Sequence, residues 1–307
     1  MNALRTVDRW WFAVMPPQRL AALRVVTGGF AWIYLCVRGA HLTSYAEFPA
    51  RNFAPLGVTS WLEAPLSPGL VYASYGLTLL AGVLFVAGAH FRLSGPAFAA
   101  GFLWVTTYRN SWGMVFHTDN LVALHLLVLG LAPAAAAWSY DARGREPGPA
   151  HARFGWAVRA LCCLTVASYV LAGVAKLRNA GWAWSEGDVL RGHVAYDALR
   201  KLELGSVHSP VGAWLVQYEW PFQVLGVLTL VLELGAPLAL SHRYLRTGWV
   251  LGVWGFHVGV IALMAITFAY PVTGCAFASF FAVEKLVTHP RVRRLLRKIS
   301  PALDLGR

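Results

Sequence analysis

Charged residues are scarce in this chain. Only 13% of its 307 residues are Asp, Glu, Lys or Arg, whereas about a quarter is usual for a soluble globular domain. The hydrophobic share is 57% and the mean hydropathy is +0.53. This shortage of charge excludes an ordinary soluble domain and predicts an integral membrane protein. The 14 tryptophans fit that class, because indoles gather at membrane interfaces.

Cysteine is also rare, and the four cysteines lie inside apolar runs: Cys36, Cys162, Cys163 and Cys275. Their spacing fits neither a disulfide framework nor a metal site, so no metal is predicted. Residues 1–19 have no sustained apolar core, and we expect no cleavable signal peptide there. The run "RWWF" at 9–12 predicts instead that 1–19 is an interfacial amphipathic segment. No repeat of fixed period is evident.

The net charge is +12, a value that in a soluble protein would suggest a nucleic-acid partner. Here the basic residues fall in short segments between apolar runs and in the tail, where Lys and Arg set the orientation of membrane helices. We therefore expect membrane lipids as partners and no nucleic acid.

Apolar runs of about 20 residues are long enough to cross a bilayer as helices. Eight stretches are candidates: 20–40, 69–89, 94–107, 119–138, 156–176, 222–241, 247–268 and 271–287. The third and eighth are short or interrupted, so the count is seven or eight. Because backbone groups in lipid must be hydrogen-bonded internally, we predict an all-α bundle of about eight transmembrane helices in one domain over 1–307.

The distribution of Lys and Arg predicts that both termini are cytoplasmic. In this orientation, the segments on the cytoplasmic side carry nine arginines before the tail: Arg5, Arg9, Arg19, Arg92, Arg143, Arg145, Arg153, Arg243 and Arg246. The basic tail, 288–307, would rest on anionic lipid. Two long outer segments, 41–68 and 177–221, are expected to cap the bundle. We expect a multi-pass protein of a bacterial inner (plasma) membrane.

Polar residues within such a bundle are functional candidates, since each charge in lipid needs a partner or a water-filled cavity. They are Arg24, Arg109, Asn110, His117, Asp119, Asn120, His125, Arg159, Lys176, Glu233 and His257. The predicted topology brings the polar groups of 109–110, 117–120 and 176 to one leaflet. This placement predicts one cavity opening outward.

The stretch "GMVFHTDNLVALHLL" at 113–127 opens one of these helices. Asp119 is positioned to cap the helix by accepting backbone N–H bonds. His117 and Asn120, three residues apart, are candidates to hold a carbonyl or orient a base. His125 is expected to face elsewhere and to make an interhelical hydrogen bond.

Lys176 ends one apolar run and Glu233 lies inside another. A helix-end lysine commonly snorkels to the headgroups, but a desolvated lysine can act as a base near neutral pH. Glu233 precedes Pro237 by four residues, which predicts a kink beside the carboxyl group. Glu233 is expected to be either neutral or paired with a cation, for which Arg24, Arg159 and His257 are the candidates. Glycines beside Lys176 and His257 indicate close approach of a neighbour.

The ordered motifs resemble the HTTM (horizontally transferred transmembrane) domain, the membrane part of vitamin K-dependent gamma-glutamyl carboxylase. They are an early Arg24, "H-x-x-N-L" at 117–121, "A-G-x-x-K-L" at 172–177 followed by Trp182 and "E-G", "E-x-x-x-P" at 233–237, and "F-H" at 256–257. The match runs in order along nearly the whole chain.

The resemblance implies that Lys176 is the base that starts quinol oxygenation and that His117 lies near the quinol, a reduced, vitamin K-like quinone. Asn120, Arg109, Asn110, Trp182 and His257 would line the site, while Arg24, Glu233, Arg159 and His125 would be buried structural groups. The carboxylases have two adjacent lysines at this motif, whereas Ala175 precedes Lys176 here. They also carry a large luminal domain that this chain lacks after its last predicted helix, which argues against peptide carboxylation.

Three function classes stay open on the sequence. The first is a membrane enzyme that uses Lys176 for oxidative or carboxylation chemistry on a small hydrophobic ligand, with a peptide or neighbouring protein open as a substrate. The second is a non-catalytic subunit that binds a quinone or lipid, or helps a neighbouring product mature or be exported. The third, ranked lowest, is a proton-coupled transporter relying on Glu233 and His257, for which an inverted repeat would be expected.

Overall fold

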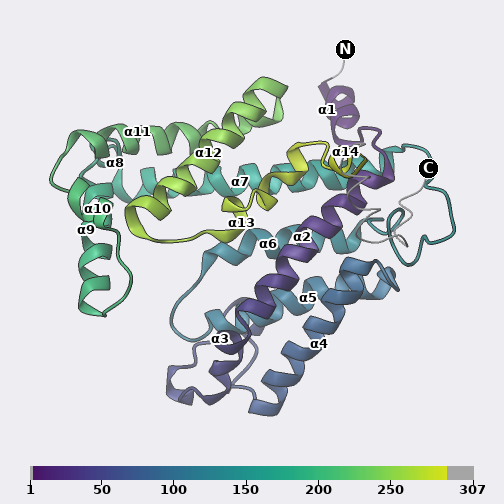
Figure 1. Ribbon diagram of the computed structural model, residues 1–307, viewed down its shortest axis with the longest axis horizontal. Helices are drawn as coiled ribbons and strands as arrows, with labels where there is room; N and C mark the ends of the chain where they lie inside the picture. Colours follow the sequence, from purple (N-terminus) through teal and green to yellow (C-terminus); the bar gives the residue numbers. More distant parts are fainter. Residues whose placement is uncertain (1–2, 289–307) are drawn as a thin grey trace. The chain divides into compact units, whose positions relative to one another are not determined.

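All regular secondary structure is helical over residues 3–288, the part of the chain that the computed structural model describes (Figure 1). One isolated bridge pairs Met15 with His151. The described residues form two compact units, one of residues 3–161 with 278–288 and the other of residues 162–277. The all-helical architecture predicted from the sequence is therefore confirmed for the described residues.

The first unit is built on four long helices and several short pieces. Its elements are α1 (Ala3–Trp11), α2 (Pro17–Val37), α3 (Gly39–Ser44), η1 (Tyr45–Glu47), η2 (Ala50–Asn52), η3 (Gly57–Thr59), α4 (Pro68–Ala87), α5 (Phe91–Asn110), η4 (His117–Asp119), α6 (Asn120–Leu131), η5 (Ala152–Phe154) and α14 (Glu284–Thr288). Helix α7 (Gly155–Ala180) begins in this unit and ends in the other. Prolines open α2 and α4, where the first backbone N–H has no partner within the helix.

Helices α2, α4, α5 and α6 form the core of the first unit (Figure 1). Helix α4 packs on α5, α5 on α6, and α2 on both α4 and α6. The backbones of α5 and α6 approach so closely that a Cβ on Gly95 would lie 2.7 Å from the carbonyl oxygen of Gly130. Small residues allow such contacts between membrane helices, where dispersion replaces the hydrophobic effect as the source of packing energy.

The segment between α3 and α4 covers the C-terminal end of α5, as predicted for the cap over 41–68. The backbone N–H of Ala54 donates to the carbonyl of Ser111 at 2.8 Å, and that of Leu66 donates to the Tyr108 hydroxyl at 3.1 Å. Tyr45 and Trp112 pack with Tyr108 in an aromatic cluster there.

The second unit holds the rest of α7 and the elements that follow it. They are α8 (Ala183–Glu186), α9 (Asp188–Glu203), α10 (Pro210–Leu215), α11 (Trp220–Leu234), η6 (Ala236–Leu240), α12 (Arg243–Met264), α13 (Ala269–Val272) and η7 (Cys275–Phe280), whose last three residues belong to the first unit. Helices α8 and α9 pack on α11, and α9 and α10 pack on α12. Segment 177–221 is thus a helical cap on this unit.

Within residues 3–288, four helical stretches are long and apolar enough to cross a membrane: Pro17–Val37, Pro68–Ala87, Ala152–Ala180 and Arg243–Met264. Two apolar helices, Asn120–Leu131 and Trp220–Leu234, are shorter. The predicted span at 119–138 was too long, because α6 ends at Leu131, two residues before Pro133. The span predicted at 222–241 likewise ends as an α-helix at Leu234, and Pro237 lies in a 3-10 turn rather than at a kink.

The predicted eighth span, 271–287, is wrong as one continuous helix. Its residues form α13, η7 and α14, with Gly274 between the first two in the left-handed region at φ 78°. Residues 276–280 are nevertheless buried. The predicted basic tail over 288–307 lies outside the described residues, except for Thr288 at the end of α14.

Candidate functional site

Lys176 and Glu233 form an ion pair in the second unit. Lys176 lies in the last turns of α7 and Glu233 in the last turn of α11, 57 residues further along the chain. The Nζ of Lys176 donates to Oε1 of Glu233, and the side chains keep only 18% and 5% of their exposure. A buried pair of this kind holds its charges out of water only because each neutralises the other.

Gly173 permits this pairing by letting α11 lie against α7. A Cβ on Gly173 would come 3.0 Å from Cβ of Glu233 and 2.9 Å from Cδ2 of Leu234. Tyr169, Gly173 and Lys176 follow each other at intervals of four and three residues, so they share one face of α7. The close approach of a neighbour expected beside Lys176 is therefore confirmed, and the neighbour is α11. At Gly255 and Gly259 the expectation of close approach was wrong, because a Cβ there would meet nothing within 4 Å.

Two aromatic rings face the Lys176 ammonium group. Its Nζ lies 4.9 Å from the centroid of the Trp184 ring and 5.7 Å from that of Phe256, within the range of cation–π attraction. Trp184 is buried, and its indole N–H donates to the hydroxyl of Thr229 on α11 at 3.0 Å. The site thus joins a cation, a carboxylate and two aromatic faces.

His257 and Tyr169 form a second polar contact in the same unit. Nε2 of His257 lies 2.8 Å from the Tyr169 hydroxyl, and both side chains are buried. Nδ1 of His257 and Oε2 of Glu233 are buried without a hydrogen-bond partner among the described residues. Unpaired polar atoms of this kind are rare in native interiors and call for a ligand, water or functional explanation.

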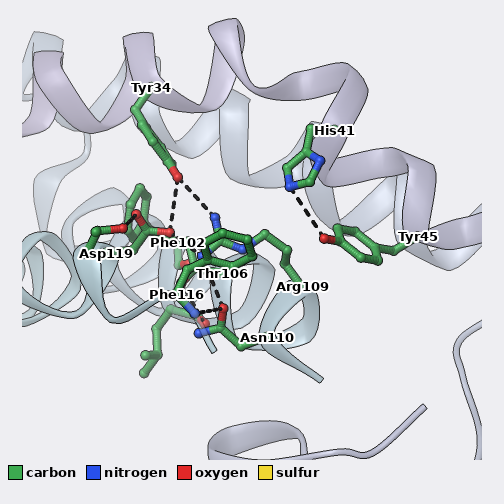
Figure 2. A network of polar contacts seen from close by, with 11 residues as sticks. Tyr34, His41, Tyr45, Phe102, Thr106, Arg109, Asn110, Phe116 and Asp119 are labelled. Atoms are coloured by element: carbon green, nitrogen blue, oxygen red, sulfur yellow. Dashed lines mark hydrogen bonds and ion pairs between the residues drawn. The ribbon is translucent and has the colours of Figure 1, made fainter. Parts of the chain in front are cut away.

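A separate polar network lies in the first unit, where side chains of α2, α5 and η4 meet (Figure 2). NH2 of Arg109 on α5 pairs with Oδ2 of Asp119 at 2.7 Å. The Tyr34 hydroxyl on α2 accepts from NH1 of Arg109 and donates to the same carboxylate oxygen, both at 3.1 Å. The guanidinium group also lies 4.2 Å from the Phe116 ring centroid. Arg109 and Asp119 are both buried.

Asn110 completes this network from the position after Arg109. Its Oδ1 accepts from NH2 of Arg109 at 3.1 Å and from the backbone N–H of Phe116 at 3.0 Å (Figure 2). His41 lies beside the network on α3, with Nε2 3.4 Å from the Tyr45 hydroxyl. Burial, with the nearby positive charges of Arg109 and Arg38, lowers the pKa of His41 below its ordinary value.

Asp119 was wrongly predicted to cap α6 with its side chain. It occupies the N-cap position, but its carboxylate makes no capping bond and instead pairs with Arg109. A buried guanidinium outcompetes backbone N–H groups for a carboxylate, because leaving that cation unpaired costs more. Asn120, the first residue of α6, is exposed. His117 begins η4, and its side chain lies outside what the structure describes.

Three other predicted residues lie in the first unit. Arg24 is fully buried in α2 and donates to the carbonyls of Ala134 and Trp138. Arg159 on α7 donates to the carbonyl of Trp10 on α1 at 3.1 Å and stacks on its ring. These contacts hold α1 against α7 within the first unit. His125 is buried and hydrogen-bonds the backbone of Leu161, confirming the expected interhelical bond.

Two predicted residues differ from expectation, and two residues of the site were not predicted. Glu233 pairs with Lys176, which was not among its predicted partners Arg24, Arg159 and His257. Trp182 is 75% exposed, and Trp184 is the indole beside Lys176. Tyr169 was not predicted as a site residue, although its spacing from Gly173 and Lys176 places the three on one face of α7. No pattern in the sequence marked Trp184, because only tertiary packing brings it next to Lys176.

The family model of the HTTM domain matches residues 12–284. The chain belongs to the HTTM domain family. This HTTM domain includes both polar sites, and with its four long apolar helices it is a multi-pass membrane protein related to the gamma-carboxylase core. No curated protein and no solved structure matches the chain.

Proposed function

We propose that this HTTM domain protein is a membrane-embedded enzyme that takes a quinol or related lipid and uses Lys176 as its base. The observation that carries the proposal is the position of the Lys176 ammonium group, held by Glu233 and facing the rings of Trp184 and Phe256. This arrangement provides a proton-exchanging group and flat apolar surfaces next to each other. Planar ligands with a polar edge fit sites of this composition.

The ion pair determines how Lys176 would become a base. A protonated lysine has no lone pair, so its proton must first leave. Transfer of that proton from Nζ to the Glu233 carboxylate gives a neutral amine and a neutral acid, without a change in net charge. The low polarity of the site favours this neutral pair more than water does. The free amine can then accept a proton from a weakly acidic hydroxyl group.

The unpaired atoms suit such a ligand. A reduced quinone, when bound, would supply ring hydroxyls and the two electrons that reduce dissolved oxygen, the electron acceptor of quinol oxygenation. Oε2 of Glu233 and Nδ1 of His257 are buried and free to hydrogen-bond to hydroxyl groups. The bond from Tyr169 fixes the orientation of the His257 ring. The roles of His117, Asn120, Arg109, Asn110 and Trp182 in ligand binding stay predictions.

Substitution of Lys176 tests the proposal, because arginine keeps the charge but does not deprotonate in proteins. The purified protein in nanodiscs is given a short-chain naphthoquinol in air-saturated buffer, where dissolved oxygen is the electron acceptor, and formation of the naphthoquinone is followed by absorbance. Lys176→Arg should lower the rate by about 10²–10⁴-fold, the usual contribution of a general base, while the melting temperature is retained. Lys201→Arg is the matched control, since Lys201 also pairs with a carboxylate, Asp197, and should keep full activity.

A non-catalytic subunit is the second candidate, and the same ion pair favours it, because Glu233 satisfies the charge of Lys176 without any chemistry. This class predicts that the wild type does not oxidise the naphthoquinol and that a quinone or other lipid co-purifies with it, detected by mass spectrometry. Equal activity of the wild type and Lys176→Arg would also move Lys176 to a structural role.

Orientation and helix count belong to the proposal. Seven helices, α2, α4, α5, α6, α7, α11 and α12, would alternate across the membrane, and the broken segment 269–288 would make the eighth crossing. Irregular backbone at membrane depth is tolerated where protein buries it, and residues 276–280 are buried. Both termini would then be cytoplasmic, as the distribution of Lys and Arg favours. The membrane would be the inner membrane of a bacterial cell.

A further inference from the structure

Helix α9 buries an ion pair and leaves large apolar side chains exposed. Asp197 is buried and pairs with Lys201 at 2.8 Å, while the Lys201 ammonium donates to the carbonyl of Met264 at the C-terminal end of α12. Tyr196, Leu199 and Leu202 are exposed on the same side of α9 as the charged Arg200 and Glu203. A helix that faces water normally turns large apolar side chains inward, whereas long charged side chains beside apolar ones suit a helix at a bilayer surface.

Tryptophans mark the surroundings of this helix. Trp182 after α7, Trp214 in α10 and Trp220 at the start of α11 are 75%, 57% and 68% exposed. Exposed indoles are costly in water but favourable at the headgroup level of a bilayer, where the ring is half apolar and its N–H can hydrogen-bond. All three belong to the same unit as α9.

The exposed face of α11 connects this region to the lipid-facing surface. Trp220, Val224, Val227 and Val231 follow at intervals of four, three and four residues, so they form one stripe on the helix. All four are exposed on an apolar helix of a membrane protein, and the stripe therefore faces acyl chains. Trp220 stands at its N-terminal end, where α10 precedes α11 by four residues.

We infer that α9 and α10 form an interfacial layer, with Tyr196, Leu199 and Leu202 immersed at the boundary between the headgroups and acyl chains of the surrounding phospholipid. The inner pairing of Asp197 and Lys201 fixes α9 to the end of α12, and Ser209, whose hydroxyl donates to the carbonyl of Ala262, fixes the start of α10 there. The exposed apolar side is left for lipid. This inference does not depend on the proposed enzyme activity.

Spin labels at two positions of α9 test this placement. In a variant with the four native cysteines replaced, Leu199→Cys carries the label on the apolar side and His193→Cys carries it about 120° away around the helix. The full chain is reconstituted in nanodiscs of phosphatidylethanolamine and phosphatidylglycerol. Power saturation then compares collisions of each label with oxygen, which enters lipid, and with a water-soluble nickel complex.

The Leu199 label should favour oxygen and lie roughly 5–10 Å below the headgroup level, the depth of interfacial helices, while the His193 label favours nickel. Leu202→Cys provides a second position, about 60° from Leu199 and opposite His193 around the helix, and should behave like Leu199. Preference for nickel at both 199 and 202 would show a water-facing helix and overturn the inference. Protection from both reagents would show that protein covers this face, through a second copy or another part of the chain, and would overturn it equally.

Discussion

Gly173 on α7 lies against Glu233 on α11, with a gap that leaves no room for a methyl group: a Cβ on Gly173 would come 3.0 Å from Cβ of Glu233. Gly173→Ala must push the two helices apart, and overpacking of this kind costs about 1–3 kcal/mol. We expect a lower melting temperature in detergent together with reduced activity, since the Lys176–Glu233 pair is stretched.

Gly255→Ala is the matched control for this substitution. Gly255 is also within a helix, α12, but a Cβ there meets nothing within 4 Å. Alanine should be neutral or stabilising by about 0.5–1 kcal/mol, because it restricts the unfolded chain more than glycine does. A melting temperature for Gly173→Ala as high as that of Gly255→Ala would contradict the close packing of α7 and α11.

The Arg109–Asp119 pair is expected to contribute to folding as a unit. Asp119→Asn leaves the buried guanidinium without its counter-charge, and removing one partner of a buried pair costs about 3–5 kcal/mol. The double variant Arg109→Met with Asp119→Asn should lose less than the sum of the two single variants, because neither charge is then stranded. Additive losses in the melting curves would show that the two side chains do not interact.

Asp141 predicts a pH dependence of stability outside the membrane spans. Its Oδ1 and Oδ2 accept the backbone N–H groups of His90 and Phe91 at the start of α5, both at 2.8 Å. The bond from Phe91, with that from His90, lowers the pKa of Asp141 below its ordinary value of about 3.9. The stabilisation is therefore present above about pH 4 and is lost as the pH falls through the lower, folded-state pKa.

Asp141→Asn isolates this effect because it removes the titration and keeps one acceptor oxygen. Melting temperatures of the two proteins between about pH 6 and pH 3 should converge at the acid end of the series. At neutral pH, the wild type should be more stable by about 0.5–1 kcal/mol. This is the lower part of the range for a side chain that caps a helix, because Asp141 is largely solvated. A constant difference at every pH would rule out the carboxylate as the cause.

The orientation is testable by cysteine labelling of intact cells. In a variant without the four native cysteines, a cysteine at 188 should react with a membrane-impermeant maleimide, because segment 177–221 is expected outside. A cysteine at 300 should react only after the cells are opened, because the tail is expected inside. Labelling of position 300 in intact cells would reverse or refute the assigned orientation.

The family and the helical class could be predicted from the sequence because both depend on local patterns. Apolar runs specify membrane helices whatever their neighbours are, since each helix satisfies its own backbone hydrogen bonds. The ordered motifs around Lys176, Glu233 and His257 predicted the HTTM domain, which the family match confirms. The predicted ends of α2, α4 and α12 lie within four residues of those observed.

Only the tertiary structure decided which polar groups meet. The sequence predicted that Glu233 is a buried carboxyl group, but not that it pairs with Lys176, 57 residues away. It also predicted that Asp119 caps a helix, whereas the carboxylate of Asp119 binds Arg109. Pairing follows from which helices pack together and at what rotation, and no local pattern records that. A charge in a low-polarity interior takes the partner that packing brings within reach, because leaving it unpaired costs more than giving up a local hydrogen bond.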